Sequence, residues 1–466
     1  MYQRHGHRAL QDHFSELRSK GEKLTFQDLQ ATLSPTDNNL TTLFTNLANK
    51  LGEAKADATN LSFIFSAPGQ ALIEWKQSKP AWSSDNTDVT WVTVNHQVAT
   101  NAAVLTKLQK FLAHPAPNGG WRNSIFEAAT PYRASKNVAL WLECKGLVSL
   151  HEGQKEEAAV VVEALANLAN FHWEEYSLVS QMSRCQTAEV GLGFTWQALQ
   201  AEGWTEEQLL KMQQCWVRMD ILEGLERGIK GERAFGLELL RLLRTAGWNS
   251  EKVFPSTKQR AGSVQSNSLN RGLMGRFYLR NTAENDFAFQ LRYWQAVVEQ
   301  VRGLRAGQPW EEVLNAGQQS HAQIQRKFNS PVRFLYLLTL LTTVNPSPAI
   351  RTAAHIETER CMAITAIALK RYQLKYGKTA PSLEALVPEF LASIPKDCMS
   401  GQVLRYKLNP DSNFTLYSVG DDGNDDGGDA THTKLDGKLG LWEGRDAVWP
   451  TPAVMNETLK TASNKP

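Results

Sequence analysis

The densest group of residues that could do chemistry is an acidic run near the carboxyl end of the chain. Residues Asp421 to Asp429 read Asp-Asp-Gly-Asn-Asp-Asp-Gly-Gly-Asp, with five carboxylates in nine residues. Like charges this close repel one another unless water, salt or a bound cation offsets them. The spacing Asp422-x-Asn424-x-Asp426-Gly427 places oxygen atoms at alternate positions around a sharp turn, as in the first half of an EF-hand loop. The run therefore predicts a calcium site.

The EF-hand pattern is incomplete, so a later residue must close the predicted site. Thr433 stands where an EF-hand has its bidentate Glu, and no paired helices are expected around the loop. Asp446 or Glu443 would supply the missing carboxylate. Calcium suits such a flexible set of oxygen ligands better than magnesium does. The alternative is a solvated acidic turn that binds no ion.

His355 and Glu359 are a second candidate pair, because residues four apart share one face of a helix. Two ligands alone do not fix a metal ion, and no H-E-x-x-H motif is present. We therefore expect a solvated helix face at this pair.

A third candidate is Glu232, which follows Gly231 and precedes Arg233 in an apolar helical stretch. Together with Arg184, these residues predict a buried ion pair between helices. The alternative is that Glu232 acts as the acid or base of an enzyme of unknown class. No G-x-S-x-G or Walker A motif supports a named chemistry, so no catalytic residue is assigned.

Composition excludes several classes of protein. The 466 residues include 50 Lys and Arg against 48 Asp and Glu, a formal charge of +2, and 42% are hydrophobic. A disordered chain would have fewer apolar residues and more net charge, and a fibrous one would be repetitive. The near-neutral balance argues against a nucleic-acid partner. Fourteen tryptophans, among them Trp173, Trp196, Trp216 and Trp294, are expected in cores between helices.

The cysteines and the apolar segments indicate in which cellular compartment the protein is expected. The cysteines are odd in number and form no C-x-x-C pair, so small buried thiols are expected. Met1 to Lys20 lacks the apolar stretch of a secretion signal. The apolar run Phe334 to Leu341 is too short to span a membrane and predicts a buried helix. Membrane association is therefore expected only through an anchor missing from this sequence. The cysteines are Cys144, Cys185, Cys215, Cys361 and Cys398.

The elements that must position these residues fall into two regions. Residues 1–345 predict an α-helical domain, since apolar residues recur at helical spacing; helices at 138–150 and 156–170 form a hairpin across Gly153. Repeated hairpins indicate a TPR-like or irregular solenoid, and a plain helical bundle is the alternative. Breaks rich in Pro, Gly and Ser occur at 115–120 and 254–272. Thr205 is expected to cap a helix over 205–228.

Residues 349–450 predict a small α+β module after Asn345-Pro-Ser-Pro348. A long helix over 349–376 ends at Gly377, and a short helix over 381–391 follows. Residues 403–408 and 414–419 alternate as two strands joined by a turn. Residues 451–466 form a tail.

Several motifs of this region resemble the globular part of the major pseudopilin of type II secretion systems. They are Ala366-Ile-Ala-Leu-Lys-Arg-Tyr372, Tyr376-Gly377, Pro381-Ser-Leu-Glu-Ala-Leu386, Ile394-Pro-Lys-Asp397, Leu404-Arg-Tyr406, Tyr417-Ser-Val-Gly-Asp-Asp-Gly423 and Arg445-Asp446. The resemblance implies a long helix on a short antiparallel sheet, with a calcium loop after the sheet and Asp446 near the closing aspartate. The candidate calcium ligands are then Asp421, Asp422, Asn424, Asp426, Asp429 and Asp446.

The order of the segments along this chain differs from their order in a pseudopilin. That family begins with a leader and an apolar polymerising helix, whereas here the module is carboxy-terminal, so assembly into a pseudopilus is not expected. With Leu24-Thr-Phe-Gln-Asp-Leu29, Ser180-Gln-Met-Ser-Arg184 and Gly231-Glu-Arg233, the whole chain resembles bacterial proteins that join a helical region to this module. No activity is established for that group. The resemblance implies a non-enzymatic scaffold in the bacterial envelope or periplasm, linked to type II secretion, with protein partners.

Overall fold

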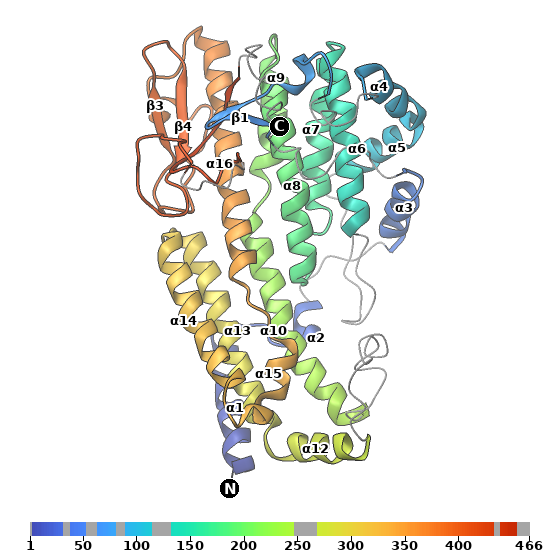
Figure 1. The fold of residues 1–466 in the computed structure, drawn as a ribbon, viewed down its shortest axis with the longest axis vertical. Helices are drawn as coiled ribbons and strands as arrows, with labels where there is room; N and C mark the ends of the chain where they lie inside the picture. The colour runs from blue at the N-terminus through green and yellow to red at the C-terminus, as the bar shows by residue number, and fades with distance from the viewer. Residues whose placement is uncertain are drawn as a thin grey trace, which may run out of the picture.

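The computed structural model describes residues 2–30, 38–52, 63–80, 89–113, 132–246, 268–432 and 439–453. The described chain is mainly helical, with a small three-stranded antiparallel sheet near its carboxyl end (Figure 1). The predicted fold class is confirmed at this level. The predicted break at 115–120 lies outside the described residues, as does the part of the 254–272 break before residue 268.

The predicted hairpin is present in the first half of the chain. Helices α6 and α7 are joined by a tight turn in which Gly153 has a φ of +76°. Both pack against α8, and α3, α4 and α5 cover their outer side (Figure 1). The helices up to this point are α1 (Tyr2–Ser19), α2 (Phe26–Gln30), α3 (Asn38–Ala48), α4 (Trp91–Thr100), α5 (Ala102–Leu112), α6 (Tyr132–His151) and α7 (Lys155–Asn170).

The middle of the chain forms α8 (Leu178–Leu199), α9 (Glu206–Val217) and α10 (Ile221–Ala246). Thr205 caps α9 as predicted, and its hydroxyl accepts from the main-chain N–H of Gln208 at 3.2 Å. The helix predicted over 205–228 is instead divided between α9 and α10. A Cβ on Gly231 would lie 1.9 Å from the Tyr176 carbonyl oxygen, so this glycine lets α10 approach the start of α8 closely.

The next elements form the end of the molecule opposite the sheet, where α1 also lies (Figure 1). Helix α13 packs against α10, α1 and α14. The buried helix predicted over 334–341 is wrong in its first half, because Phe334 is 41% exposed in a short 3₁₀ helix. These elements are α12 (Ser268–Asn281), α13 (Ala283–Ala306), α14 (Trp310–Phe328), η3 (Arg333–Tyr336) and α15 (Leu337–Thr342).

The long helix predicted after Pro348 is confirmed as α16 (Ser347–Tyr376), which ends at Gly377 with a φ of +68°. It contacts α8, α9, α10 and α14 on one side and strand β4 on the other. One apolar core runs through the helical region and the small sheet, and it includes Leu165, Ile367 and Leu416. The short helix predicted over 381–391 is only the 3₁₀ turn η4 (Leu383–Leu386).

Two small sheets complete the fold. Strands β3 (Arg405–Leu408), β4 (Phe414–Ser418) and β5 (Ala447–Val448) form the antiparallel sheet, and the predicted turn contains Ser412 at a φ of +66°. A second sheet was not predicted, because it joins distant short segments. In it β2 pairs with β1 and, in parallel, with β6, so the predicted tail begins with a strand. Its elements are β1 (Phe65–Ala67), β2 (Gln70–Ala71) and β6 (Thr451–Pro452), and the 3₁₀ turn η1 (Glu74–Lys76) follows β2.

The prediction of buried cysteines is confirmed, and the core prediction for tryptophan is confirmed at three of its four named positions. Trp196, Trp216 and Trp294 are each fully buried, whereas Trp173 is half-buried. All five cysteines are buried and unpaired. Within the described residues, no helix combines the length and the apolar character needed to cross a membrane.

Candidate functional site

The acidic run forms a loop between β4 and β5, at the edge of the small sheet. Four of its glycines have positive φ, and these conformations fold the loop back on itself. At Gly420 an added Cβ would lie 2.6 Å from the Arg445 carbonyl oxygen, so the two ends of the loop touch. The four glycines are Gly420, Gly423, Gly427 and Gly428.

Asp446 lies at the centre of this loop. Its side chain is fully buried, and its carboxylate accepts hydrogen bonds from the main-chain amides of Asp426 at 3.4 Å, Gly428 at 2.7 Å and Asp429 at 3.2 Å. No ion pair of Asp446 occurs among the described residues. Burial raises the pKa of Asp446, and the three amides only partly offset it. Asp446 therefore holds residues 426–429 of the acidic run in place through hydrogen bonds.

Asp421 points away from that centre, toward α16. Its carboxylate accepts from His355 Nε2 at 2.8 Å and pairs with Arg351. Partial burial would raise the pKa of Asp421, but the bonds to His355 and Arg351 outweigh it and lower the pKa. Asp421 therefore ties the loop to the helical core.

The exposed acids of the loop have neighbours of their own. Asp422 accepts from the main-chain amide of Asn424 at 3.0 Å. Arg445 Nη1 lies 3.3 Å from Asp426, and its Nε lies 3.7 Å from Asp429. Hydrogen bonding to Thr431 and the charge of Arg445 lower the pKa of Asp429. In this arrangement arginine supplies the positive charge that faces Asp426 and Asp429.

The structure therefore brings some predicted ligands together and separates others. Asp446 contacts the segment that carries Asp426 and Asp429, whereas Asp421 is turned to α16. Among the described residues, no group of three or more His, Cys, Asp or Glu side chains is arranged to hold a metal ion. The calcium site stays a prediction.

The solvated helix face predicted for His355 and Glu359 is wrong. His355 stacks on Trp442 with ring centroids 3.7 Å apart, and burial lowers its pKa although Asp421 opposes that effect. Glu359 is 5% exposed and accepts from Trp442 Nε1 at 2.7 Å. Helical spacing alone could not reveal this, because the segment that covers the face lies about 80 residues later in the chain.

Sequence reasoning missed a pair of buried acids in the helical body. Glu143 on α6 is completely buried, and neither of its carboxylate oxygens has a hydrogen-bond partner among the described residues. Burial, and then the charge of Glu74 on η1, raise the pKa of Glu143 well above its usual range. A Glu inside the apolar stretch Val138 to Leu150 was the one available signal.

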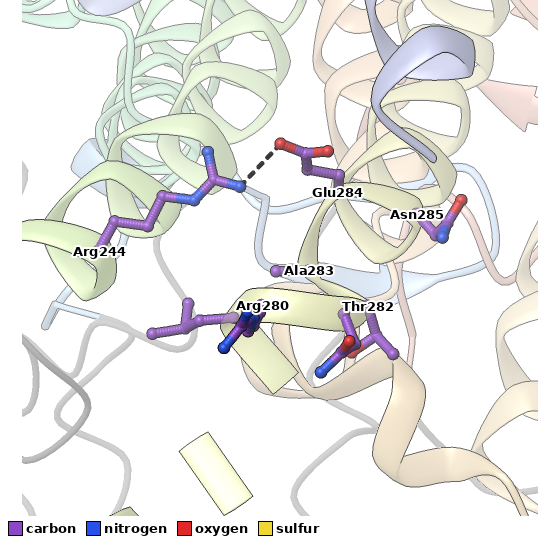
Figure 2. A pocket seen from close by; sticks show the side chains of 8 residues that line it. Arg244, Arg280, Thr282, Ala283, Glu284 and Asn285 are labelled. Atoms are coloured by element: carbon purple, nitrogen blue, oxygen red, sulfur yellow. Dashed lines mark hydrogen bonds and ion pairs between the residues drawn. The ribbon is translucent and has the colours of Figure 1, made fainter. Parts of the chain in front are cut away.

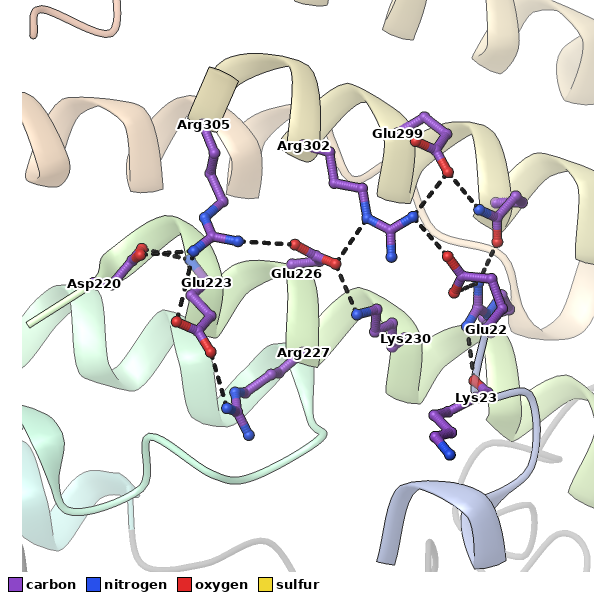
Figure 3. Close-up of polar contacts among 12 residues, drawn as sticks. Glu22, Lys23, Asp220, Glu223, Glu226, Arg227, Lys230, Glu299, Arg302 and Arg305 are labelled. Carbon is purple, nitrogen blue, oxygen red and sulfur yellow. Dashed lines mark hydrogen bonds and ion pairs between the residues drawn. The ribbon is translucent and has the colours of Figure 1, made fainter. Parts of the chain in front are cut away.

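The predicted ion pair of Arg233 exists, but with a different partner. Arg233 Nη1 lies 2.9 Å from Glu22, which also accepts from Arg302 at 2.6 Å. Figure 3 shows the network continuing through Glu226 to Arg305 and joining the segment after α1 to α10 and α13. Glu22 lies too far away in the sequence for spacing to identify it.

Glu232 and Arg184 take no part in the ion pair of Arg233. Burial raises the pKa of Glu232 to about 7, and the Leu178 main-chain amide partly offsets it. Arg184 is 3% exposed and donates to the Ala169 carbonyl at 2.9 Å and to Gln181 Oε1 at 2.6 Å. Burial lowers the pKa of Arg184 to about 10. No carboxylate pairs with Arg184 in the parts of the chain that the structure describes.

A small pocket lies where α10 meets the turn between α12 and α13 (Figure 2). Arg244 on one wall pairs with Glu284 on the other at 2.9 Å. Neither His nor Cys lines the pocket, and its one carboxylate, Glu284, is paired with Arg244. Its lining residues are Arg244, Leu279, Arg280, Asn281, Thr282, Ala283, Glu284 and Asn285.

Comparisons with protein-family models, with curated proteins and with solved structures found no match to this chain. The resemblance to pseudopilins therefore stays a prediction that rests on the motifs quoted above.

Proposed function

We propose that the loop between β4 and β5 binds calcium and that the ion stabilises a pseudopilin-like carboxy-terminal module. The observation that carries the proposal is Asp446, a fully buried carboxylate with no cationic partner among the described residues. An ionised carboxylate accepts about four hydrogen bonds or metal contacts, and three loop amides bond to this one. A cation beside Asp446 would offset the cost of burying its charge.

The surrounding residues fit calcium chemistry. Asp422, Asn424, Asp426 and Asp429 carry exposed or half-buried side-chain oxygens on the segment held by Asp446. Arg445, whose side chain is 53% exposed, would swing into solvent when calcium takes its place beside Asp426 and Asp429. Calcium would supply charge neutralisation and cross-link the two ends of the loop.

Asp421 extends the effect of the ion to the rest of the protein. Because it bonds to His355 and Arg351 on α16, ordering of the loop would also stabilise the contact between the sheet and the long helix. We propose on this basis, and on the resemblance, a non-enzymatic scaffold of the bacterial envelope linked to type II secretion. In this account the helical region supplies the surfaces for protein partners.

Thermal unfolding of the full chain in millimolar calcium, compared with chelator, tests the proposal. Calcium is expected to raise the melting temperature, because an ion that binds only the folded state stabilises it by mass action. Asp422→Ala should weaken this shift. Asp411→Ala is the matched control, since Asp411 also accepts from the main-chain amide two residues later, at 3.0 Å, but lies in the turn between β3 and β4. Equal melting temperatures in calcium and chelator would contradict the proposal.

A second candidate function is an enzyme whose site lies between the helices, with a structural calcium. One observation favours it: the raised pKa of Glu232, about 7, suits an acid or base at neutral pH. Screening the full chain against hydrolase substrates, with Glu232→Gln beside it, would identify such an activity. A turnover that Glu232→Gln abolishes would favour the enzyme over the scaffold.

A further inference from the structure

The end of the molecule opposite the sheet exposes apolar side chains that would ordinarily be buried. In the segment between α14 and α15, Val332 is 44% exposed and Phe334 is 41% exposed. They precede Leu335 and Tyr336, which are half-buried. Phe334 begins the longest apolar run of the chain, yet its side chain and that of Val332 stay exposed.

The charged residues near this segment in the sequence are all basic. No Asp or Glu occurs between Glu312 and Glu357, whereas Arg326, Lys327 and Arg333 all fall there. Lys327 lies over the Tyr336 ring, with Nζ 4.6 Å from its centroid. Arg326 and Arg333 are exposed, and neither forms an ion pair among the described residues.

Helix α12 adds a similar surface at the same end (Figure 1). Phe277 is 57% exposed and stands beside Arg276, which is also exposed and makes no ion pair with any described residue. Hydrogen bonds connect α12 to the start of α15. The Tyr278 hydroxyl accepts from the main-chain amide of Leu338 at 3.2 Å and donates to the buried carboxylate of Asp286 at 2.5 Å.

That junction holds the exposed segment in place. Asp286, completely buried on α13, also accepts from the Leu338 amide at 2.7 Å and so caps the start of α15. Residues 331–336 are thus fixed between α14 and a capped helix, and their exposed side chains form a preorganised surface.

We propose that this surface docks on a lipid bilayer that contains anionic phospholipids. We name it the basic apolar end and define it by Arg276, Phe277, Arg326, Val332, Arg333 and Phe334. Each cation near such a bilayer is attracted to the anionic headgroups, and exposed aromatic side chains bury themselves at the boundary between headgroups and acyl chains. The combination favours a bilayer over a nucleic acid, since phosphates alone would not require exposed Val and Phe.

The proposal does not depend on calcium binding, because the basic apolar end and the acidic loop lie at different places in the fold (Figure 1). It also changes the expectation that membrane association needs an anchor absent from this sequence. A peripheral surface is sufficient for reversible binding.

Co-sedimentation of the full chain with vesicles tests the proposal. One vesicle set contains phosphatidylcholine and phosphatidylglycerol in equal parts, and the other contains phosphatidylcholine alone. Binding is expected only to the first set and should weaken with added salt. Arg333→Glu with Phe334→Ser should reduce it at least about tenfold, since two favourable contacts are lost.

The matched control is Val217→Ser with Arg218→Glu, an exposed apolar residue next to an exposed arginine at the end of α9. It should bind as the unchanged protein does, and thermal unfolding of both double variants checks that each is folded. Failure to bind anionic vesicles, equal binding to both vesicle sets, or equal loss in the control would overturn the proposal. Tighter binding to RNA or duplex DNA than to anionic vesicles would also overturn it.

Discussion

Carboxylates in two regions of this protein respond to their surroundings in opposite ways. In the loop between β4 and β5, Asp421 and Asp425 lie beside cations, and hydrogen bonds and charge outweigh burial and lower their pKa values. In the helical body, burial raises the pKa of Glu143 well above its usual range and that of Glu359 to about 8. The carboxyl group therefore favours its ionised form at Asp421 and Asp425 and its protonated form at Glu143 and Glu359.

The difference predicts opposite contributions to stability as pH changes. A group with a lowered pKa stabilises the fold above its unfolded pKa, and this stabilisation is lost as pH falls through the folded value. A buried acid with a raised pKa holds its proton in the folded state, so stability falls as pH rises above the unfolded value. Carboxylates that face cations and carboxylates buried without a cation can thus be separated by titration.

The largest change in the free energy of unfolding is expected for a substitution of Glu143. Glu143→Met replaces a buried acid that has no partner among the described residues with an apolar side chain of similar size, so it should stabilise the protein. At pH values between the unfolded and folded pKa of Glu143, the stability advantage of Glu143→Met over the unchanged protein should grow by ~1.4 kcal/mol per pH unit. This slope follows because one proton is involved. Urea unfolding from pH 5 to pH 8 measures it.

Glu202→Met is the control for Glu143, because Glu202 is exposed in the turn between α8 and α9. Its effect on the free energy of unfolding should be small and independent of pH. A pH-independent change in Glu143→Met would contradict the account of the buried acids.

A smaller change in the free energy of unfolding is expected for Asp446, a loop acid whose pKa, like that of Glu143, is raised by burial. Asp446→Asn keeps the shape but leaves a single acceptor oxygen, whereas two of the main-chain amides bond to Oδ2 and one bonds to Oδ1, so at least one amide loses its acceptor. The free energy of unfolding in chelator should fall by about 2–3 kcal/mol. Asp429→Asn, whose side chain is 43% exposed, should change it far less. Equal losses in the two variants would mean that Asp446 does not organise the loop.

The smallest effect is expected at Asp425, which lies 2.9 Å from Arg405 Nε and accepts from the Tyr417 hydroxyl at 3.0 Å. Asp425→Asn should cost about 0.2–1 kcal/mol at neutral pH, as exposed ion pairs do. Because the pKa of Asp425 is lowered, this cost should vanish in strongly acidic solution, where the carboxyl is protonated in both states. A cost that persists in acid would indicate packing instead of charge.

Local patterns predicted the elements whose causes are local. Helix α16 and its cap at Gly377 were predicted because apolar spacing and a glycine stop act within a few residues. The cap at Thr205 and the turn between β3 and β4 were predicted for the same reason. The sequence also placed the acidic run directly after a strand.

Features that depend on distant segments could not be predicted. The parallel pairing of β2 with β6 joins residues about 380 positions apart, and Glu22 meets Arg233 across about 210 positions. His355 was expected in solvent because Trp442, which covers it, belongs to another part of the chain. Tertiary packing decides these positions, and helical or strand periodicity carries no information about the partner.

Calcium binding by the acidic loop is the central claim, and isothermal titration calorimetry of the full chain tests it most directly. We predict that a single calcium ion binds each chain, with a dissociation constant of roughly 10⁻⁴ to 10⁻³ M, as in extracellular calcium modules. Asp422→Ala should weaken this binding, and Asp411→Ala should leave it unchanged. Absence of binding heat at millimolar calcium, or equal affinity in Asp422→Ala and the unchanged protein, would contradict the assignment of calcium to this loop.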